Sequence, residues 1–245
     1  PRVIAAHARF ERVGAEARRL GLQADAVFAD LGFASTQMDD PARGFAFSRE
    51  GPLDMRLNPE EGATAADLVA TMSERELADL IFELGEDPFA RRIARVIVDR
   101  RREGPIRTTQ DLAAAVVGAY GARARQSRMH PATRTFMALR IAVNNEFECL
   151  DNLLDTIEAG LRDLHEHRQS WLAPDARVAF LSFHSLEDRS IKRAMVDWDR
   201  QAWATRLTRK PSVAGEAEQL HNPRARSAKL RAVRALPRRQ EDASV

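Results

Sequence analysis

Two apolar runs open the chain and predict strands. Residues 2–8 (RVIAAHA) form the first run, and residues 26–29 (AVFA), bounded by Asp25 and Asp30, form the second. A short run that is apolar throughout is typical of a strand buried on both faces, as in a parallel sheet. The stretch 11–20 between the runs has helical periodicity. Strand, helix and strand in this order predict a βαβ unit of a doubly wound sheet.

From residue 64 to about residue 128 the pattern of apolar positions is helical. Thr64 opens one predicted helix, and Ser73 with Glu76 three residues later forms a capping box for the next. Thr108 or Thr109 caps a further helix. Because this block carries no strand signal, we expect an all-helical insertion in the sheet domain.

The remainder of the chain predicts one long helix and the rest of the sheet. An apolar stripe continues from Phe136 to Leu161, and Pro174 interrupts the pattern after it. Residues 177–184 (RVAFLSFH) predict a second buried strand, with Ser185 as the N-cap of the following helix. The tail from residue 205 predicts the last two strands.

Polar side chains gather just after the strand at 26–30. Asp30 stands at its carboxyl end, where ligands bind in open α/β sheets. An isolated Asp-x-Gly can equally be a turn cap, and that alternative stays open. The loop that follows, 37–56, is rich in acids and arginines, and a long polar loop beside a strand end is more often functional than structural.

Five blocks resemble those of the MraW-like family of bacterial enzymes. They are DLGFASTQMDDPARGFAFSREGPLDMR (30–56), GEDPFARRIARVIVDRR (85–101), MHPATRTFMALRIAVNNE (129–146), FLSFHSLEDRSIKR (180–193) and NPRARSAKLRAV (222–233). Members of this family use S-adenosylmethionine to methylate the exocyclic N4 of a cytosine in the decoding region of 16S ribosomal RNA. The resemblance implies that the chain is an rRNA (cytosine-N4-)-methyltransferase.

The resemblance also implies an α/β fold. We expect a Rossmann-like class I methyltransferase sheet with an inserted helical domain for substrate recognition. The expected parts are 1–62 and 137–245 for the methyltransferase domain and 63–136 for the insertion. The family carries a Gly-rich cofactor loop after its first strand, and no such G-x-G element occurs in these 245 residues. The sheet is therefore expected to be incomplete at its N-terminus, as in an N-terminally truncated member.

Site residues carry over from the family position by position. Phe10, Asp30 and Gln37 match positions that contact the cofactor, and Asp30-Leu31-Gly32 occupies the place of the usual amino-methyltransferase tetrapeptide, which makes Asp30 the candidate catalytic residue. His184 and Ser185 are our hypothesis for positioning the target base. The candidates for RNA phosphate contacts are Arg224, Arg226, Lys229 and Arg231. No metal site is expected.

Composition and charge narrow the alternatives. Cys149 is the only cysteine, which excludes an intramolecular disulfide and a cysteine-based metal cluster and fits a reducing cytoplasm. No apolar run reaches the length of about 20 residues that a membrane span needs. The net charge is only +2, but basic residues cluster in 91–107 and 206–239, which favours a polyanion such as RNA over a solvated helix face.

Two other functions stay open at this point. One is an inactive fragment that still binds RNA, and the other is a nucleotide-binding hydrolase of similar topology, which is disfavoured because the chain has no P-loop. The expected partner is 16S rRNA or the small ribosomal subunit. The sequence does not fix the oligomeric state, and a homodimer is one arrangement that it allows.

Overall fold

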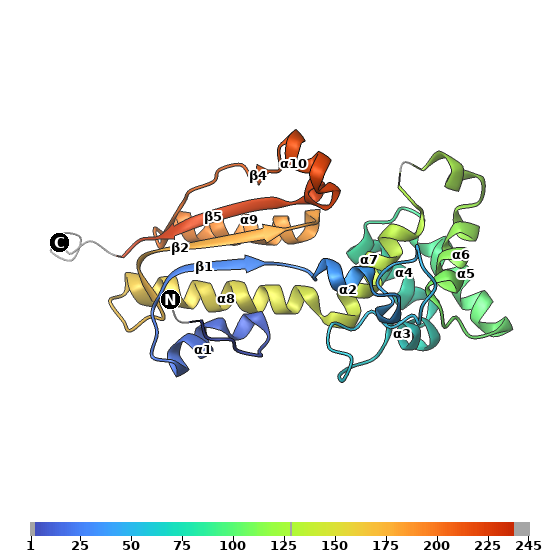
Figure 1. The fold of residues 1–245 in the computed structure, drawn as a ribbon, viewed down its shortest axis with the longest axis horizontal. Helices are drawn as coiled ribbons and strands as arrows, with labels where there is room; N and C mark the ends of the chain where they lie inside the picture. Colours follow the sequence, from blue (N-terminus) through green and yellow to red (C-terminus); the bar gives the residue numbers. More distant parts are fainter. Residues whose placement is uncertain (1–2, 128, 238–245) are drawn as a thin grey trace. The chain divides into compact units, whose positions relative to one another are not determined.

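The computed structural model describes residues 3–127 and 129–237, and these form two compact units (Figure 1). The first, which we call the sheet unit, combines the chain up to Gly32 with the chain from Phe147 onward. The second, which we call the helical unit, is the continuous segment Phe33–Glu146. The α/β class predicted from the sequence is confirmed, and each unit is described by itself.

The sheet unit contains a mixed sheet with the strand order β1-β2-β5-β3, and β4 pairs with β5. The strands are β1 (Ala24–Asp30), β2 (Leu172–Ser182), β3 (Ala204–Arg206), β4 (Ser212–Val213) and β5 (Lys229–Ala235). β1 and β2 are parallel, whereas β5 runs antiparallel to β2, β3 and β4. The predicted βαβ unit of residues 2–30 was wrong for its described residues, because residues 3–8 form no strand and the parallel neighbour of β1 is β2.

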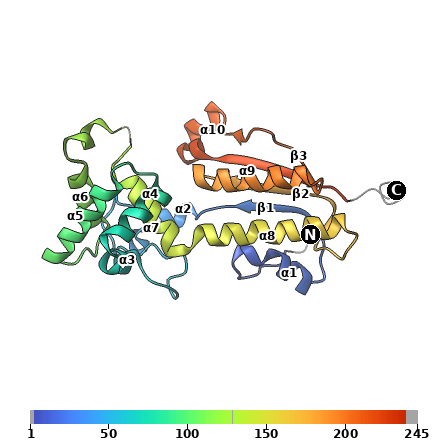
Figure 2. The same ribbon diagram turned by 180° about the vertical axis from the view of Figure 1, so that it is seen from behind.

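The described part of the sheet unit also contains four α-helices and two 3-10 helices. They are η1 (Phe10–Arg12), α1 (Val13–Arg19), α8 (Glu146–His165), α9 (Ser185–Arg200), α10 (Glu216–His221) and η4 (Pro223–Ser227). In Figure 2, α8 runs along β1 and α9 along β2 and β5. Trp198 of α9 donates from Nε1 to Glu158 Oε2 of α8 at 3.1 Å, so the two helices share a face. Val178 and Phe180 of β2 are fully buried in the core beneath them.

The other face of β1 is open, so the prediction that this strand is buried on both faces was wrong. Val27 points into the core, but its neighbour Phe28 is 63% exposed. The predicted strand at 2–8 was also wrong for its described residues. Residues 3–8 have no regular structure and are exposed, because among the described residues no strand pairs with them.

β2 begins earlier than predicted and includes Pro174. The pairing of β1 with β2 shifts register between Ala24 and Ala26, so a bulge separates Leu172 from Arg177. Pro is tolerated in a strand at such an irregularity, where its missing N–H removes no ladder hydrogen bond. Pro174, which interrupts the apolar pattern in the sequence, therefore lies at an irregularity inside β2 and not before the start of the strand.

The helical unit has the predicted run of helices from residue 64 onward. Its elements are α2 (Ser35–Asp39), η2 (Pro41–Arg43), α3 (Ala65–Thr71), α4 (Glu74–Gly85), α5 (Ala90–Glu103), α6 (Thr109–Tyr120), η3 (Gly121–Gln126) and α7 (Ala132–Asn144). Of these, α2, η2 and η3 were not predicted. Reciprocal capping boxes join Thr64 to Asp67, Ser73 to Glu76 and Thr108 to Asp111. Thr108, and not Thr109, is therefore the cap of α6.

The predicted long helix after residue 130 is two helices. α7 ends at Asn144, and Asn145 adopts a left-handed conformation with φ 50° before α8 begins. Asn is one of the few residues that adopt this conformation readily, so it can interrupt a helix without breaking the apolar stripe. None of the described helices is long and apolar enough to cross a membrane.

The boundaries of the two compact units differ from those of the predicted domains. The segment 33–62, assigned above to the methyltransferase domain, supplies Phe45, Leu53 and Met55 to the core of the helical unit. These three side chains are nearly or completely buried. The compact helical unit therefore begins at Phe33 and ends at Glu146.

Candidate active site

The carboxyl ends of β1 and β2 lie at the same end of the sheet unit. Asp30 pairs with Leu181 in the parallel register, and the backbone N–H of Leu31 donates to the carbonyl of Leu181 at 3.0 Å. β2 ends one residue later at Ser182. Residues Asp30–Gly32 and Phe183–Ser185 therefore leave the sheet side by side, at the edge where open α/β sheets bind ligands.

His184 has a structural role that the sequence did not reveal. It is the N-cap of α9, and its Nδ1 accepts the backbone N–H of Glu187 at 3.4 Å. The prediction that Ser185 caps this helix was wrong, because Ser185 is its first residue. The His184 ring also makes an edge-to-face contact with Phe147, with centroids 5.8 Å apart. The ring is thus fixed at the end of β2.

Glu187 completes this turn. Its Oε2 accepts the backbone N–H of Phe183 at 3.0 Å, and its Oε1 lies 3.1 Å from His184 Nε2. The Glu187 side chain is 6% exposed, so the contact is shielded from water. The sequence predicted this acid only as a favourable charge in the first turn of a helix, whereas the structure uses it to hold the strand end.

Asp188 forms a buried ion pair with the neighbouring strand. Its carboxylate accepts from Arg231 Nε at 2.6 Å and Nη2 at 3.1 Å, and Lys229 Nζ lies 3.5 Å away. Burial alone would raise the pKa of Asp188, but the hydrogen bonds and positive charges of Arg231 and Lys229 hold that pKa below its ordinary value. The pair ties the start of α9 to β5.

This ion pair changes the set of phosphate candidates. Arg231 is 6% exposed and both of its bonds go to Asp188, so it is not available to a phosphate. Lys229 keeps a third of its side chain exposed. Arg224 and Arg226 lie exposed on η4. The geometry therefore removes Arg231 from the predicted contacts and leaves the other three.

The three cofactor candidates fall in both units. Phe10 opens η1 and is 44% exposed, and Asp30 is exposed at the end of β1. Within the described part of the sheet unit, no hydrogen bond or ring contact joins these two residues. Gln37 belongs to the helical unit, where its Oε1 accepts the backbone N–H of Ala34 at 3.0 Å and so caps α2.

The polar loop of the first block is held by side chains of the helical unit. Asn144 accepts the N–H of Leu57 at 2.7 Å and donates to the carbonyl of Met55 at 2.8 Å. Met55 is fully buried with φ 64°, a strained conformation for a residue with a Cβ. Asp54 pairs with Arg56 in a bidentate contact of 2.8–2.9 Å, which lowers the pKa of that carboxyl. The loop thus has one defined backbone path.

A stacked pair of phenylalanines, with an arginine over each ring, supports the same loop. The rings of Phe33 and Phe45 are stacked at 4.9 Å, with Arg140 over Phe33 at 4.8 Å and Arg43 over Phe45 at 5.8 Å. Arg140 also donates from Nε and Nη2 to the two carboxylate oxygens of Glu146, at 2.7 and 2.8 Å. Sequence reasoning missed these positioning roles; the signal that could have revealed them is the close spacing of Arg43 and Phe45 in the loop.

Comparison with known proteins decides the family. The model of the MraW methylase family matches residues 1–236, which is nearly the whole sequence. The chain belongs to this family. The resemblance read from the five sequence blocks is thereby confirmed, and the match agrees with the Rossmann-like methyltransferase sheet.

Relatives of the MraW methylase family show how much of a member the chain spans. It is 50% identical over 212 residues to ribosomal RNA small subunit methyltransferase H of Prochlorococcus marinus (strain MIT 9303), covering 86% of this chain and 64% of that protein. It is also 50% identical over 213 residues to the protein of that name from Synechococcus sp. (strain WH7803), which covers 86% of this chain and 65% of that protein. To the protein of that name from Syntrophobacter fumaroxidans it is 45% identical over 226 residues, which covers 86% of this chain and 67% of that protein. The chain thus spans about two thirds of the length of these MraW-family relatives.

Proposed function

We propose that the chain supplies the catalytic sheet edge and the RNA-binding parts of an S-adenosylmethionine-dependent rRNA methyltransferase. The proposed product is N4-methylcytosine in the decoding region of 16S rRNA. The observation that carries the proposal is the exposed Asp30 carboxylate at the paired carboxyl ends of β1 and β2, in a chain of the MraW methylase family. The names of the relatives support rRNA as the substrate class.

The described residues fit part of a cofactor site. Phe10 offers an exposed aromatic ring that would stack on adenine, and Asp30 offers an exposed carboxylate that would accept hydrogen bonds from an amine-bearing ligand. Gln37 would contribute through its amide N–H₂, since its oxygen already caps α2. S-adenosylmethionine supplies a methyl group that its sulfonium has already activated, so little acid or base catalysis is needed.

The proposed role of Asp30 is to orient the target amine. A carboxylate oxygen that accepts an N–H of the cytosine amine leaves the nitrogen lone pair directed at the incoming methyl carbon. Such alignment has to hold the reacting atoms within about 3–3.5 Å. We further propose that His184 and Ser185, next to Asp30 at the strand ends, position the base, which must leave its stack to react.

RNA backbone contacts are proposed for the exposed basic residues of the tail. Arg224 and Arg226 on η4, with Lys229 at the start of β5, would bind phosphates, whereas Arg231 would serve the fold through Asp188. The helical unit is proposed as the substrate-recognition part. The sequence favours a basic surface there, with seven arginines between residues 91 and 107.

Calorimetry with S-adenosylmethionine tests the cofactor proposal. We would titrate the 245-residue chain and a version that carries a family Gly-rich segment ahead of residue 1. Each of the two chains is measured without substitution and with Asp30→Asn. Asp25→Asn, on the same strand at its other end, is the matched control. Micromolar binding that Asp30→Asn weakens and Asp25→Asn leaves unchanged is expected. Binding that neither substitution changes would contradict the role of Asp30.

Methyl transfer to small ribosomal subunits tests the substrate proposal. We expect mass spectrometry of digested 16S rRNA to find N4-methylcytidine in the decoding region only when cofactor and active chain are both present. Cofactor binding with methylation of another base would refute the N4-cytosine assignment. RNA binding with no cofactor binding would instead favour the second candidate function, an RNA-binding chain without catalysis. Sedimentation of the same samples tests whether the chain forms a homodimer.

A further inference from the structure

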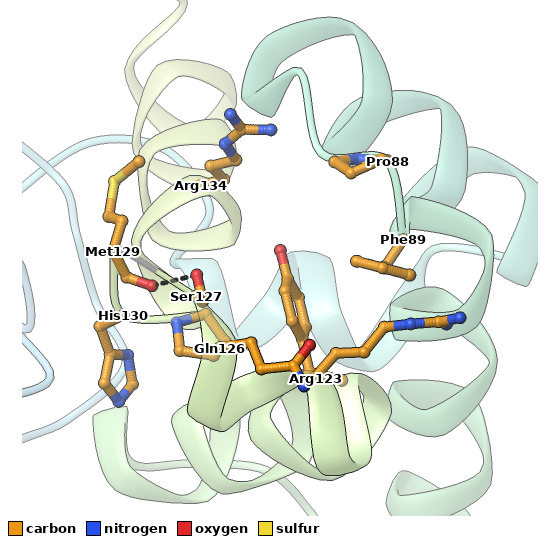
Figure 3. Close-up of a pocket in the computed structure, with 10 residues that line it drawn as sticks. Pro88, Phe89, Arg123, Gln126, Ser127, Met129, His130 and Arg134 are labelled. Atoms are coloured by element: carbon orange, nitrogen blue, oxygen red, sulfur yellow. Dashed lines mark hydrogen bonds between the residues drawn. The ribbon is translucent and has the colours of Figure 1, made fainter.

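A cavity of about 360 Å³ lies within the helical unit and is not explained by the sheet-edge site (Figure 3). It is formed by the segment before α5, the end of α6, η3 and the start of α7. Its lining residues are Pro88, Phe89, Tyr120, Arg123, Gln126, Ser127, Met129, His130, Pro131 and Arg134. Its volume is at the lower end of the range of about 300–1,000 Å³ that is typical of small-ligand pockets.

The aromatic wall of the cavity is fixed by a buried carboxylate. Asp87 is fully buried, and its oxygens accept the hydroxyl of Tyr120 at 2.9 and 3.0 Å and the backbone N–H of Phe89 at 2.9 Å. The two rings meet edge to face, with centroids 4.7 Å apart. Burial, followed by the Asp87 carboxylate, raises the pKa of Tyr120 to about 12, so the hydroxyl stays a donor to Asp87. The Asp87 side chain thus fixes the positions of both Tyr120 and Phe89.

The rest of the lining is cationic or polar. Arg123 places its guanidinium 5.5 Å from the centre of the Phe89 ring, and Arg134 donates to the carbonyl of Glu86 across the cavity mouth. His130 accepts the backbone N–H of Ala132 at its Nδ1, which leaves Nε2 as the donor of the neutral ring. Among the described residues that line the cavity, none is acidic. A ligand with a planar ring and a negative charge matches this lining.

The charge around the cavity favours a chain of phosphates over a single anion. Arg92 of α5 lies within 3.5 Å of the position that a Cβ on Gly121 would take, which places its guanidinium beside the start of η3. Arg91 on α5 is also exposed. Figure 3 shows Arg134 and Arg123 at opposite sides of the opening. A phosphate backbone entering on one side and leaving on the other would meet a cation at each.

We propose that this cavity binds one unpaired nucleotide of a single-stranded RNA segment. The base would lie against the ring pair of Phe89 and Tyr120, and Arg123 and Arg134 would hold the phosphates that flank it. Proteins recognise unpaired RNA in this way, by stacking splayed bases on aromatic side chains beside basic groups. The inference rests on the proposed function only in taking RNA as the substrate class, since the cavity and the sheet-edge site share no residue.

Fluorescence anisotropy with a labelled oligouridine of about ten nucleotides tests the proposal, a length within the site sizes of single-strand binding folds. The test variants are Arg123→Ala and Phe89→Leu in the full chain. The matched control is Arg125→Ala, which removes an exposed arginine two residues away on η3 that does not line the cavity. Far-UV circular dichroism and thermal unfolding confirm that each variant folds.

We expect Arg123→Ala and Phe89→Leu each to weaken oligouridine binding by roughly 5- to 100-fold, the range for loss of one stacked base. Arg125→Ala should weaken it less than about 3-fold, as for a single screened surface charge. In a plot of log affinity against log salt concentration, Arg123→Ala should make the slope less steep by about 0.7, because it removes one phosphate contact. Phe89→Leu should keep the wild-type slope, because it removes no charge. Equal losses for Arg123→Ala and Arg125→Ala would mean a diffuse basic surface and would overturn the proposal.

Two further experiments distinguish RNA from free nucleotides as the ligand, and failure of this proposal from failure of the proposed function. Uridine monophosphate that competes as strongly as the oligomer would mean a site for free nucleotides and would overturn RNA as the occupant. A wild-type chain that does not bind oligouridine would do the same. Because no cofactor is present in this assay, oligouridine binding that depends on Arg123 supports the cavity even where calorimetry shows that S-adenosylmethionine does not bind.

Discussion

The ion pair between Asp188 and Arg231 is the strongest single constraint at the candidate active site. Both groups are nearly buried, and two hydrogen bonds of 2.6 and 3.1 Å join the guanidinium to the carboxylate. Breaking a buried pair costs more than the pair contributes, because one charge stays behind without a partner. We therefore expect Asp188→Asn to destabilise the sheet unit strongly.

The expected loss in free energy of unfolding for Asp188→Asn is about 3 kcal/mol, measured by urea titration. Asp175→Asn is the matched control, because Asp175 of β2 lies 3.9 Å from Arg234, another arginine of β5, and both side chains are largely exposed. Exposed pairs contribute little, so this control should unfold like the wild type. Equal effects of the two substitutions would refute the burial argument.

The same pair predicts a dependence of stability on pH. The native pKa of Asp188 is lowered, so the folded state holds the proton less tightly than the unfolded chain, whose aspartate pKa is about 3.9. The stabilisation is then fully present above that value and is lost as the pH falls through the lowered native pKa. The difference in unfolding free energy between wild type and Asp188→Asn should be constant from neutral pH to about pH 5 and shrink below about pH 4. A difference that grows on acidification would contradict this sign.

At the scale of elements, the capping boxes were predicted correctly, whereas strand partners and the exposed face of β1 were not. The capping boxes at Thr64, Ser73 and Thr108 are confirmed because a cap depends on residues three positions apart. The open face of β1 could not be predicted, because Ala26–Ala29 is apolar whichever face the helices cover. The strand predicted at 2–8 failed for a related reason, since a strand needs a partner that the sequence does not show.

Side-chain roles at the candidate site were predictable only in part. The polar residues after β1 and β2 were found because the ends of parallel strands meet at one edge. That His184 caps α9 was not predicted, since His is not among the preferred caps. Nor was the burial of Arg231, which faces inward because it pairs with Phe180 of β2 on the core side of the sheet. Its basic neighbours gave no sign of this.

Close packing of α8 on β2 gives a prediction for glycine substitutions. A Cβ at Gly160 would lie 2.7 Å from Trp171 Nε1 and 3.0 Å from Leu172 Cδ1, whereas a Cβ at Gly118 of α6 would meet nothing within 4 Å. Gly160→Ala should destabilise by about 1–3 kcal/mol through overpacking. Gly118→Ala should stabilise by about 0.5–1 kcal/mol, because Ala favours the helix. Thermal and urea unfolding measure both, and a stabilising Gly160→Ala would refute the packing.

For the whole molecule, the two separate cores predict independent folding of the helical unit. Its buried cluster draws every member from between Phe45 and Leu139. The segment Phe33–Glu146 expressed alone should therefore be helical by far-UV circular dichroism and should unfold cooperatively with urea. The sheet unit is formed by two chain segments and has no continuous equivalent. A helical unit that is unfolded by itself would show that its core is insufficient.

The division into two units also separates the chromophores of the protein. Trp171, Trp198 and Trp203, which are all of its tryptophans, belong to the sheet unit, and Tyr120, its only tyrosine, belongs to the helical unit. Light at the red edge of aromatic absorption excites tryptophan alone, so intrinsic emission reports on the sheet unit. Tyrosine bands in ultraviolet resonance Raman report on the helical unit. The unlabelled wild-type chain therefore carries a distinct optical reporter for the folding of each unit and for tests of the proposed RNA binding.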